Sequence, residues 1–188
     1  RFEIPCIRIK DFATGSECDE LVSAMDAVGL HKTYNVPGLT HPPTYVGLTQ
    51  FEKRKARKEH YFAEVDQAWA EREAVLAKMS WDPFDRMWGL IRNIYPERSL
   101  TLAEEPGYGR YYAGIIRETS GGGTLHADVA MYSARDYLIG QVIDQITWNF
   151  FASHVEGEGG PRVGPAARAV QQPKHALSPS VLQWRQGM

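Results

Sequence analysis

His126 and Asp128 are the two residues whose types and spacing could do chemistry. They stand two positions apart in the stretch GGTLHADV, which we expect to be a strand. Side chains two apart on a strand project from the same face, so an imidazole nitrogen and a carboxylate oxygen could grip one metal ion. A second histidine from a distant strand would complete a facial triad, which leaves open coordination positions on Fe(II). The pair alone is a weak signal, and the alternative is two polar side chains that face solvent.

The surroundings of this H-x-D pair make a stronger pattern than the pair itself. A glycine loop, Ser120-Gly121-Gly122-Gly123, comes immediately before it. The stretches EEPGYGRYYAGIIRETSGGGTLHADVA and GQVIDQITWNFFASHVEGEGG resemble a group of fungal and bacterial oxygenases that depend on Fe(II) and 2-oxoglutarate and act on small molecules. The resemblance covers roughly residues 47–160, and the H-x-D motif with its flanks is its most specific part.

The resemblance implies a double-stranded β-helix, or jelly-roll, core of the kind found in prolyl hydroxylases. It implies a non-haem iron dioxygenase that uses Fe(II) as its cofactor and 2-oxoglutarate and O2 as co-substrates. Some relatives are halogenases in which Gly or Ala replaces the aspartate, whereas Asp128 is present here, which favours oxidation of a C–H bond. The expected reaction is hydroxylation of a small molecule, such as a secondary-metabolite intermediate, with release of succinate and CO2.

The resemblance also implies a distal histidine near the start of a late strand and an arginine about ten residues further on. His175 and Arg185 match this pattern. We therefore expect iron to be held by His126, Asp128 and His175, and the far carboxylate of 2-oxoglutarate to pair with the planar guanidinium fork of Arg185. A rival distal ligand is His154, although it leaves little chain for the intervening strands. A residue outside this sequence is the third option.

The chain departs from the pattern in one place. Only 14 residues separate Gly160 from His175, whereas the resemblance implies two or three strands there. A barrel without those strands would have an open edge beside the iron. We therefore expect residues to be missing from the sequence at this point and after Met188.

Two further side chains are candidates for binding the co-substrate. Arg117, on the predicted strand before the glycine loop, could meet 2-oxoglutarate or a substrate acid; its alternative is an ordinary charge on an edge strand. Asn149 could point inward from a strand over 141–153, with Gln145 four positions earlier on the same face.

Hydrophobic periodicity predicts the elements that must position these residues. Helices should cover the first half, where Thr14-Gly15-Ser16 offers the start of one, Gly29 ends it, and Asp82-Pro83 starts another. From Ser99 onward we expect strands alone, with Tyr111 and Tyr112 on opposite faces, one in the pocket and one under the helices. The expected elements are a strand over 4–10, a helix over 17–28, a loop over 31–49, helices over 51–79 and 84–95, and strands over 99–105, 109–118, 123–129 and 141–153.

Helices followed by strands indicate an α+β fold. We expect a single domain over residues 1–188, with helical support over about 1–98 and the β-helix core over about 99–188. The Ala-, Glu- and Arg-rich helix near 62–79 could pair with a second copy in a homodimer, or cover the β-core.

The bulk composition narrows the class of protein. The net charge of −2 does not favour a nucleic-acid binder, and no apolar run is long enough for a membrane-spanning helix. Two cysteines, Cys6 and Cys18, cannot form a disulfide scaffold, and the first residues do not form a secretory signal. These features predict a cytoplasmic protein, and the resemblance implies that it is an enzyme with a small-molecule substrate.

Two other functions stay open. The same iron chemistry could act on a protein side chain, as in prolyl hydroxylases. A non-enzymatic β-helix domain could instead bind an acidic partner through the basic run 53–58, although a solvated helix face is the simpler interpretation of that run. The remaining histidines, His31, His41 and His60, are expected to be ordinary surface or loop residues.

Overall fold

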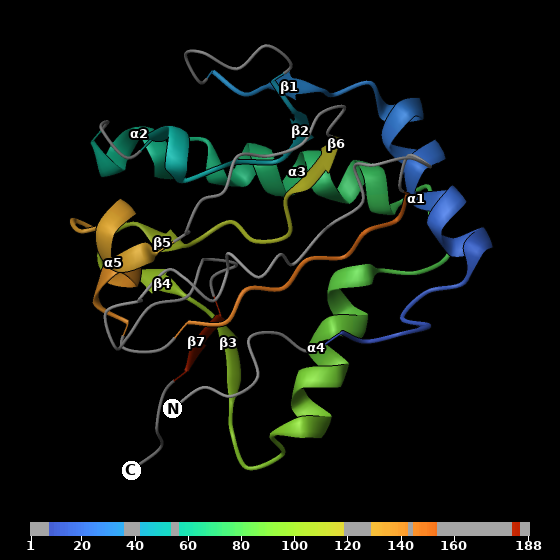
Figure 1. Ribbon diagram of the computed structural model, residues 1–188. Coiled ribbons are helices and arrows are strands. Elements are labelled where there is room, and N and C mark those ends of the chain that lie inside the picture. Colours follow the sequence, from blue (N-terminus) through green and yellow to red (C-terminus); the bar gives the residue numbers. More distant parts are fainter. Residues whose placement is uncertain are drawn as a thin grey trace, which may run out of the picture.

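The computed structural model describes residues 8–35, 42–53, 57–118, 129–142, 145–153 and 182–184 (Figure 1). The helices are α1 Gly15–Val28, α2 Lys58–Phe62, α3 Val65–Leu76, α4 Pro83–Ile94 and α5 Ala130–Ser133, with 3-10 turns η1 Phe51–Lys53 and η2 Leu138–Gln141. The strands are β1 Lys32–Thr33, β2 Thr44–Val46, β3 Leu100–Leu102, β4 Glu104–Glu105, β5 Gly109–Arg110, β6 Ile116–Glu118 and β7 Leu182–Trp184.

The strands form three small antiparallel sheets. β1, β2 and β6 make a three-stranded sheet in that order, while β3 pairs with β7 and β4 pairs with β5. In the largest sheet Tyr45 lies opposite Lys32 on one side and Arg117 on the other. The fold is therefore mixed α+β, as predicted. Among the described strands no sheet closes into a barrel or jelly roll, and the β-helix core stays a prediction.

The two helices with clear sequence signals form where they were predicted. Thr14 and Glu17 make a reciprocal capping box at the start of α1, and Gly29 ends the helix in the left-handed conformation with φ 63°. At α4 the Asp82 side chain accepts from the Phe84 amide, and proline occupies the first turn.

The single helix predicted over 51–79 is wrong in its continuity. The structure has η1, α2 and α3 there, and α2 and α3 are separated by Ala63 and Glu64. These two residues keep near-helical φ and ψ, so a tight turn joins the helices. The residues of this turn are themselves of helix-forming types. Helix propensity is only a weak guide, so it could not predict that the helix is interrupted here.

The division into a helical half and a strand half is also wrong. β1 and β2 lie in the stretch 31–49, which was predicted to be loop, and β2 forms the centre of the largest sheet. Beyond Ser99 the chain forms α5 and η2, and the described residues of 141–153 contain no strand. Strands of two or three residues and a helix of four are too short to give a periodic signal.

The described residues pack into two cores. The tyrosine core lies between α2, α3 and the two segments 103–112 and 134–139; its buried members are Leu48, Tyr61, Val65, Ala68, Ala103, Tyr111, Tyr112, Ala134, Tyr137 and Ile139. The helix–sheet core joins α1 and α3 to β2; its buried members are Leu21, Ala24, Met25, Val46 and Val75. Figure 1 shows β4, β5 and α5 at the opposite end of the molecule from α1.

Candidate functional site

The predicted iron ligands lie outside the described residues. His126 and Asp128 fall in 119–128, and His175, like its rival His154, falls in 154–181. Arg185, the predicted anchor of 2-oxoglutarate, lies outside as well. The metal site therefore stays a prediction, and the structure describes what lies on either side of the H-x-D motif.

Both flanks of the motif are built into the body of the protein. On the upstream side β6 pairs with β2, and Glu118 accepts from the Thr44 hydroxyl at 3.2 Å. On the downstream side Val129 is buried and Ala130, which begins α5, is 1% exposed. The chain thus enters the motif from the largest sheet and leaves it at a buried helix start.

A glutamine side chain holds the downstream flank. The Ala130 amide donates to Oε1 of Gln145 at 3.1 Å, which fixes which end of the Gln145 amide faces the backbone. Nε2 of Gln145 is buried and meets no acceptor among the described residues. A buried amide donor without an acceptor costs about 1–3 kcal/mol, so this group suits a carboxylate or carbonyl nearby.

Arg117 lies on β6, as its position before the glycine loop suggested. Its side chain is exposed, and its guanidinium carbon is 5.3 Å from the centre of the Tyr34 ring. This contact is a cation–π interaction on the surface of the largest sheet. The co-substrate role of Arg117 is not tested by this geometry and stays a prediction.

Asn149 does not point inward from a strand. Residues 145–153 have no regular structure, and the Asn149 side chain is exposed. Its neighbours Trp148 and Phe150 instead pack on Phe12, with ring centres 5.9 and 5.2 Å apart. Burial still alternates from Trp148 to Ser153, but Asn149 falls on the exposed face, because Trp148 and Phe150 on either side of it pack against the N-terminal segment.

Tyr111 and Tyr112 were expected on opposite faces, with one in a pocket. Both are instead buried in the tyrosine core, at 1% and 5% exposure. Tyr111 contacts Phe62 of α2 and Tyr112 contacts Trp69 of α3, with ring centres 5.1 and 5.2 Å apart. Both rings therefore pack under helices, and the expectation that one of them lines a pocket is wrong for the described structure.

Glu105 is a buried carboxylate that sequence reasoning missed. It is 4% exposed and accepts from three segments: the Lys58 ammonium, the Tyr111 hydroxyl, and the Leu138 amide at 2.7 Å. Burial alone would raise the pKa of Glu105, but these three donors outweigh it and hold the pKa below its ordinary value. The carboxylate is therefore ionised and links α2, β4 and η2.

Aromatic rings surround this carboxylate. Tyr137 is 2% exposed and lies between Tyr61, Phe62 and Tyr111, with ring centres 6.0 to 6.4 Å away. The Lys58 ammonium sits 5.6 Å from the centre of the Tyr137 ring. Only the Glu105 end of this ion pair is buried, since the Lys58 side chain is 29% exposed, so the carboxylate depends on its donors more than Lys58 depends on it.

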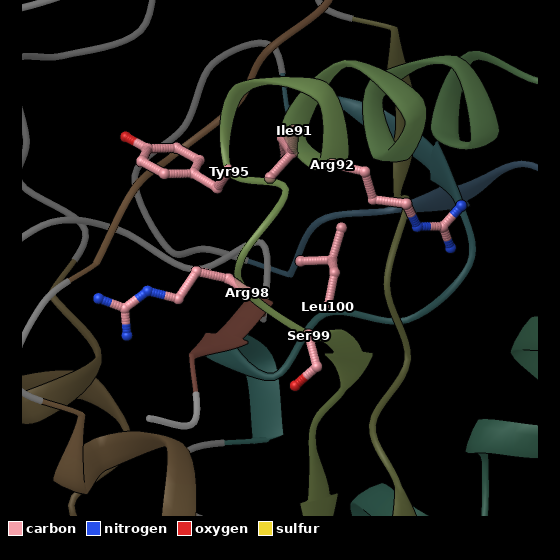
Figure 2. A pocket seen from close by; sticks show the side chains of 6 residues that line it. All are labelled: Ile91, Arg92, Tyr95, Arg98, Ser99 and Leu100. Carbon is pink, nitrogen blue, oxygen red and sulfur yellow. The ribbon is translucent and has the colours of Figure 1, made fainter. Parts of the chain in front are cut away.

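A shallow hollow lies between the end of α4 and the start of β3. It holds about 170 Å³ of space, counting space open to solvent, and its lining residues are Ile91, Arg92, Tyr95, Arg98, Ser99 and Leu100. Figure 2 shows the guanidinium groups of Arg92 and Arg98 turned to opposite sides. Since these charges do not converge, the hollow is not arranged to hold an anion.

The described ranges contain neither a cluster of potential metal ligands nor a helix that could span a membrane. No three His, Cys, Asp or Glu side chains within them gather closely enough to hold a metal ion. None of the helices in this part of the chain has the length and apolar character needed to cross a lipid bilayer.

Comparison with known proteins gives one informative likeness. The chain is 33% identical over 113 residues to leucinostatins biosynthesis cluster protein S of Purpureocillium lilacinum. The aligned part is 60% of this chain and 46% of the relative, so the chain spans about half the length of that protein. No protein-family model matches the chain, and no solved structure does. The chain is thus distantly similar to a protein of a secondary-metabolite biosynthesis cluster.

Proposed function

We propose that this protein is an Fe(II)- and 2-oxoglutarate-dependent oxygenase with a double-stranded β-helix core, which oxidises a C–H bond of a small molecule. His126, Asp128 and His175 hold the iron, and Arg185 pairs with the far carboxylate of 2-oxoglutarate. The observation that carries the proposal is the H-x-D motif behind its glycine loop, which supplies one imidazole and one carboxylate to the same ion.

The flanks of the motif agree with such a site. A ligating carboxylate needs hydrogen-bond donors around it to fix its orientation. The buried Nε2 of Gln145 is a donor of this kind, and Oε1 of the same amide binds the backbone two residues after Asp128. When bound, Fe(II) with 2-oxoglutarate and O2 supplies the oxidation, and the protein contributes ligands, orientation and exclusion of water.

The similarity to a leucinostatin biosynthesis cluster protein supports a biosynthetic substrate. We infer that the substrate is an intermediate of secondary metabolism rather than a protein side chain. The binding-module alternative relied on the basic run 53–58. Lys53 and Lys58 at its ends already pair with Glu64 and Glu105 within the protein, which leaves them less suited to an external acidic partner.

The test is an anaerobic titration of the protein with Fe(II) and 2-oxoglutarate, read by the visible charge-transfer absorption of the chelate. We expect the band in the wild type, its loss in His126→Ala and Asp128→Ala, and its retention in His60→Ala, which removes an exposed histidine of α2. Separate His175→Ala and His154→Ala variants identify the distal ligand. Absence of the band from folded, iron-loaded wild type would rule out the proposed co-substrate.

A further inference from the structure

Tyr111 and Glu105 form a hydrogen-bonded pair inside the tyrosine core. Tyr111 is 1% exposed, and its hydroxyl donates to Oε2 of Glu105, which is 4% exposed. The Leu138 amide donates to the same oxygen at 2.7 Å, and the Lys58 ammonium donates to Oε1. A buried carboxylate, which is a base, therefore lies in direct contact with a buried phenol.

This contact matters when the Tyr111 ring loses an electron. Burial, followed by the hydrogen bond to Glu105, raises the pKa of Tyr111, so the phenol keeps its proton in the resting protein. A phenol that has lost an electron is a strong acid, and releasing its proton into an apolar interior is costly unless a base lies beside it. Oε2 of Glu105 is such a base, because it already accepts the phenolic hydrogen.

The neighbouring tyrosines of the core bond to backbone groups instead. The Tyr61 hydroxyl oxygen accepts from the Tyr112 amide at 3.2 Å, and the Tyr112 hydroxyl donates to the Gly114 carbonyl at 3.2 Å. A backbone carbonyl is a far weaker base than a carboxylate. The ring centres of Tyr61 and Tyr111 are 5.9 Å apart, so electrons can pass between these rings. An electron vacancy in this core is therefore held best at Tyr111.

Tyr108 connects Tyr111 to the surface of the protein. Tyr108 is 39% exposed, and its ring stacks on that of Phe62 with the centres 5.1 Å apart. Phe62 also meets the Tyr111 ring edge to face, again with the centres 5.1 Å apart. The Tyr108 hydroxyl donates to Glu59 at 2.8 Å, so this ring has a carboxylate of its own that can take its proton. An oxidant at the surface can therefore draw an electron from Tyr111 without touching it.

We propose that Tyr111 is a redox-active tyrosine that supplies an electron to oxidants that reach Tyr108. The oxidant is a one-electron oxidant of high potential, such as a Ru(III) complex or the hydroxyl radical. One electron leaves Tyr111 for the oxidant by way of Phe62 and Tyr108, and the phenolic proton moves to Oε2 of Glu105. A neutral tyrosyl radical and a neutral carboxylic acid result. A thiol or ascorbate then returns one electron, and the proton goes back from Glu105 to the phenol oxygen.

Lys58 controls how readily this proton moves. Burial raises the proton affinity of Glu105, whereas the hydrogen bond from Lys58 lowers it. The Lys58 side chain is 29% exposed, so water solvates its ammonium when Glu105 becomes neutral. Lys58→Met removes the charge that competes for the carboxylate, and we expect the Tyr111 radical to live longer in this variant than in the wild type.

The test is flash photolysis of the metal-free protein with a Ru(II) polypyridyl sensitiser and a reversible electron acceptor, with electron paramagnetic resonance of samples frozen after the flash. We expect a long-lived tyrosyl radical in the wild type and its loss in Tyr111→Phe and Glu105→Gln. In Glu105→Gln the amide oxygen still accepts from Tyr111 and Leu138 but cannot take a proton, so packing is kept while the base is removed. Tyr108→Phe should form the same radical more slowly.

Tyr45 provides the matched control. It is 6% exposed and donates to Glu52 at 2.6 Å, but it lies outside the tyrosine core and its ring contacts Tyr34. We expect Tyr45→Phe to keep the long-lived radical, and circular dichroism checks that each variant is folded. The proposal is overturned if the wild type gives no long-lived radical, if Glu105→Gln keeps the wild-type lifetime, or if the signal survives in Tyr111→Phe. These outcomes are independent of the charge-transfer titration, because no iron is present.

Discussion

Arg86 of α4 and Glu17 of α1 form a two-pronged ion pair: Nη2 lies 2.5 Å from Oε1, and Nη1 lies 3.1 Å from Oε2. Glu17 also accepts from the Thr14 amide at 2.8 Å. One carboxylate therefore caps α1 and joins that helix to α4. The Arg86 guanidinium, followed by the Thr14 amide, lowers the pKa of Glu17 from 4.5 to about 2.

This pair predicts an acid-dependent stability. Because the folded pKa of Glu17 lies below the unfolded value, its contribution is full above pH 4.5 and disappears as the pH falls toward about 2. Glutamine can still serve the capping box, so Glu17→Gln removes the ion pair and spares the cap. We expect the free energy of unfolding to fall more steeply with decreasing pH in the wild type than in Glu17→Gln. Urea denaturation at a series of pH values from 4.5 to about 2 measures this difference. Parallel pH profiles would contradict the prediction.

Gly47 should tolerate no side chain. Its φ is +108°, and an added Cβ would lie 2.2 Å from the hydroxyl oxygen of buried Tyr112. We expect Gly47→Ala to lower the free energy of unfolding by roughly 2–4 kcal/mol, from backbone strain and displacement of the ring. Gly29→Ala is the matched control, because φ is +63° there but the space is open, and roughly 1 kcal/mol should be lost. Equal losses in the two variants would show that Tyr112 does not confine Gly47.

Lys32 and Glu71 should be strongly coupled. Glu71 is 6% exposed and accepts from the Lys32 ammonium at 2.6 Å, while the same ammonium donates to the carbonyl of Gly47 at 2.9 Å. Lys32→Met leaves a buried carboxylate without its cation, which we expect to cost about 1–3 kcal/mol of unfolding free energy. The double variant with Glu71→Leu should recover most of this loss. Additive losses in the double-mutant cycle would count against the coupling.

Metal binding should stabilise the fold without any turnover. A ligand that binds only the native state contributes about 2.7 kcal/mol at a concentration 100 times its dissociation constant. We expect Mn(II) with 2-oxoglutarate to raise the melting temperature of the wild type and of His60→Ala, but not of His126→Ala. Differential scanning fluorimetry measures the melting temperatures. An equal rise in the melting temperature of all three proteins would point to non-specific metal binding.

Sequence reasoning succeeded where a local signal exists. α1 and α4 were predicted because their ends carry Thr14, Gly29 and Asp82, residues whose side chains or backbone freedom satisfy helix termini. The α+β class was predicted from helical patterns followed by strand patterns along the chain. These features depend on residues that are close together in the sequence, so they can be recognised without knowing the tertiary structure.

The features that failed depend on distant partners. β2 is the central strand because β6, more than 70 positions later, pairs along its second edge, and nothing within residues 31–49 indicates that pairing. Glu105 gave no sequence signal, because a glutamate in a short strand looks the same whether it faces water or three donors. Asn149 was assigned to the wrong face for the same reason, since contacts of Trp148 and Phe150 with the distant Phe12 decide which face of the segment turns inward.

The pairing of β2 with β6 has a consequence for how the chain is made. Thr44 and Glu118 are 74 positions apart, so the ends of a long loop must meet before the largest sheet is complete. Such closure loses entropy before any contact compensates for it, which slows folding. On the ribosome, β2 emerges well before its partner strand. Nascent chains that end before β6 should therefore expose an unpaired strand edge and depend on chaperones to stay unaggregated.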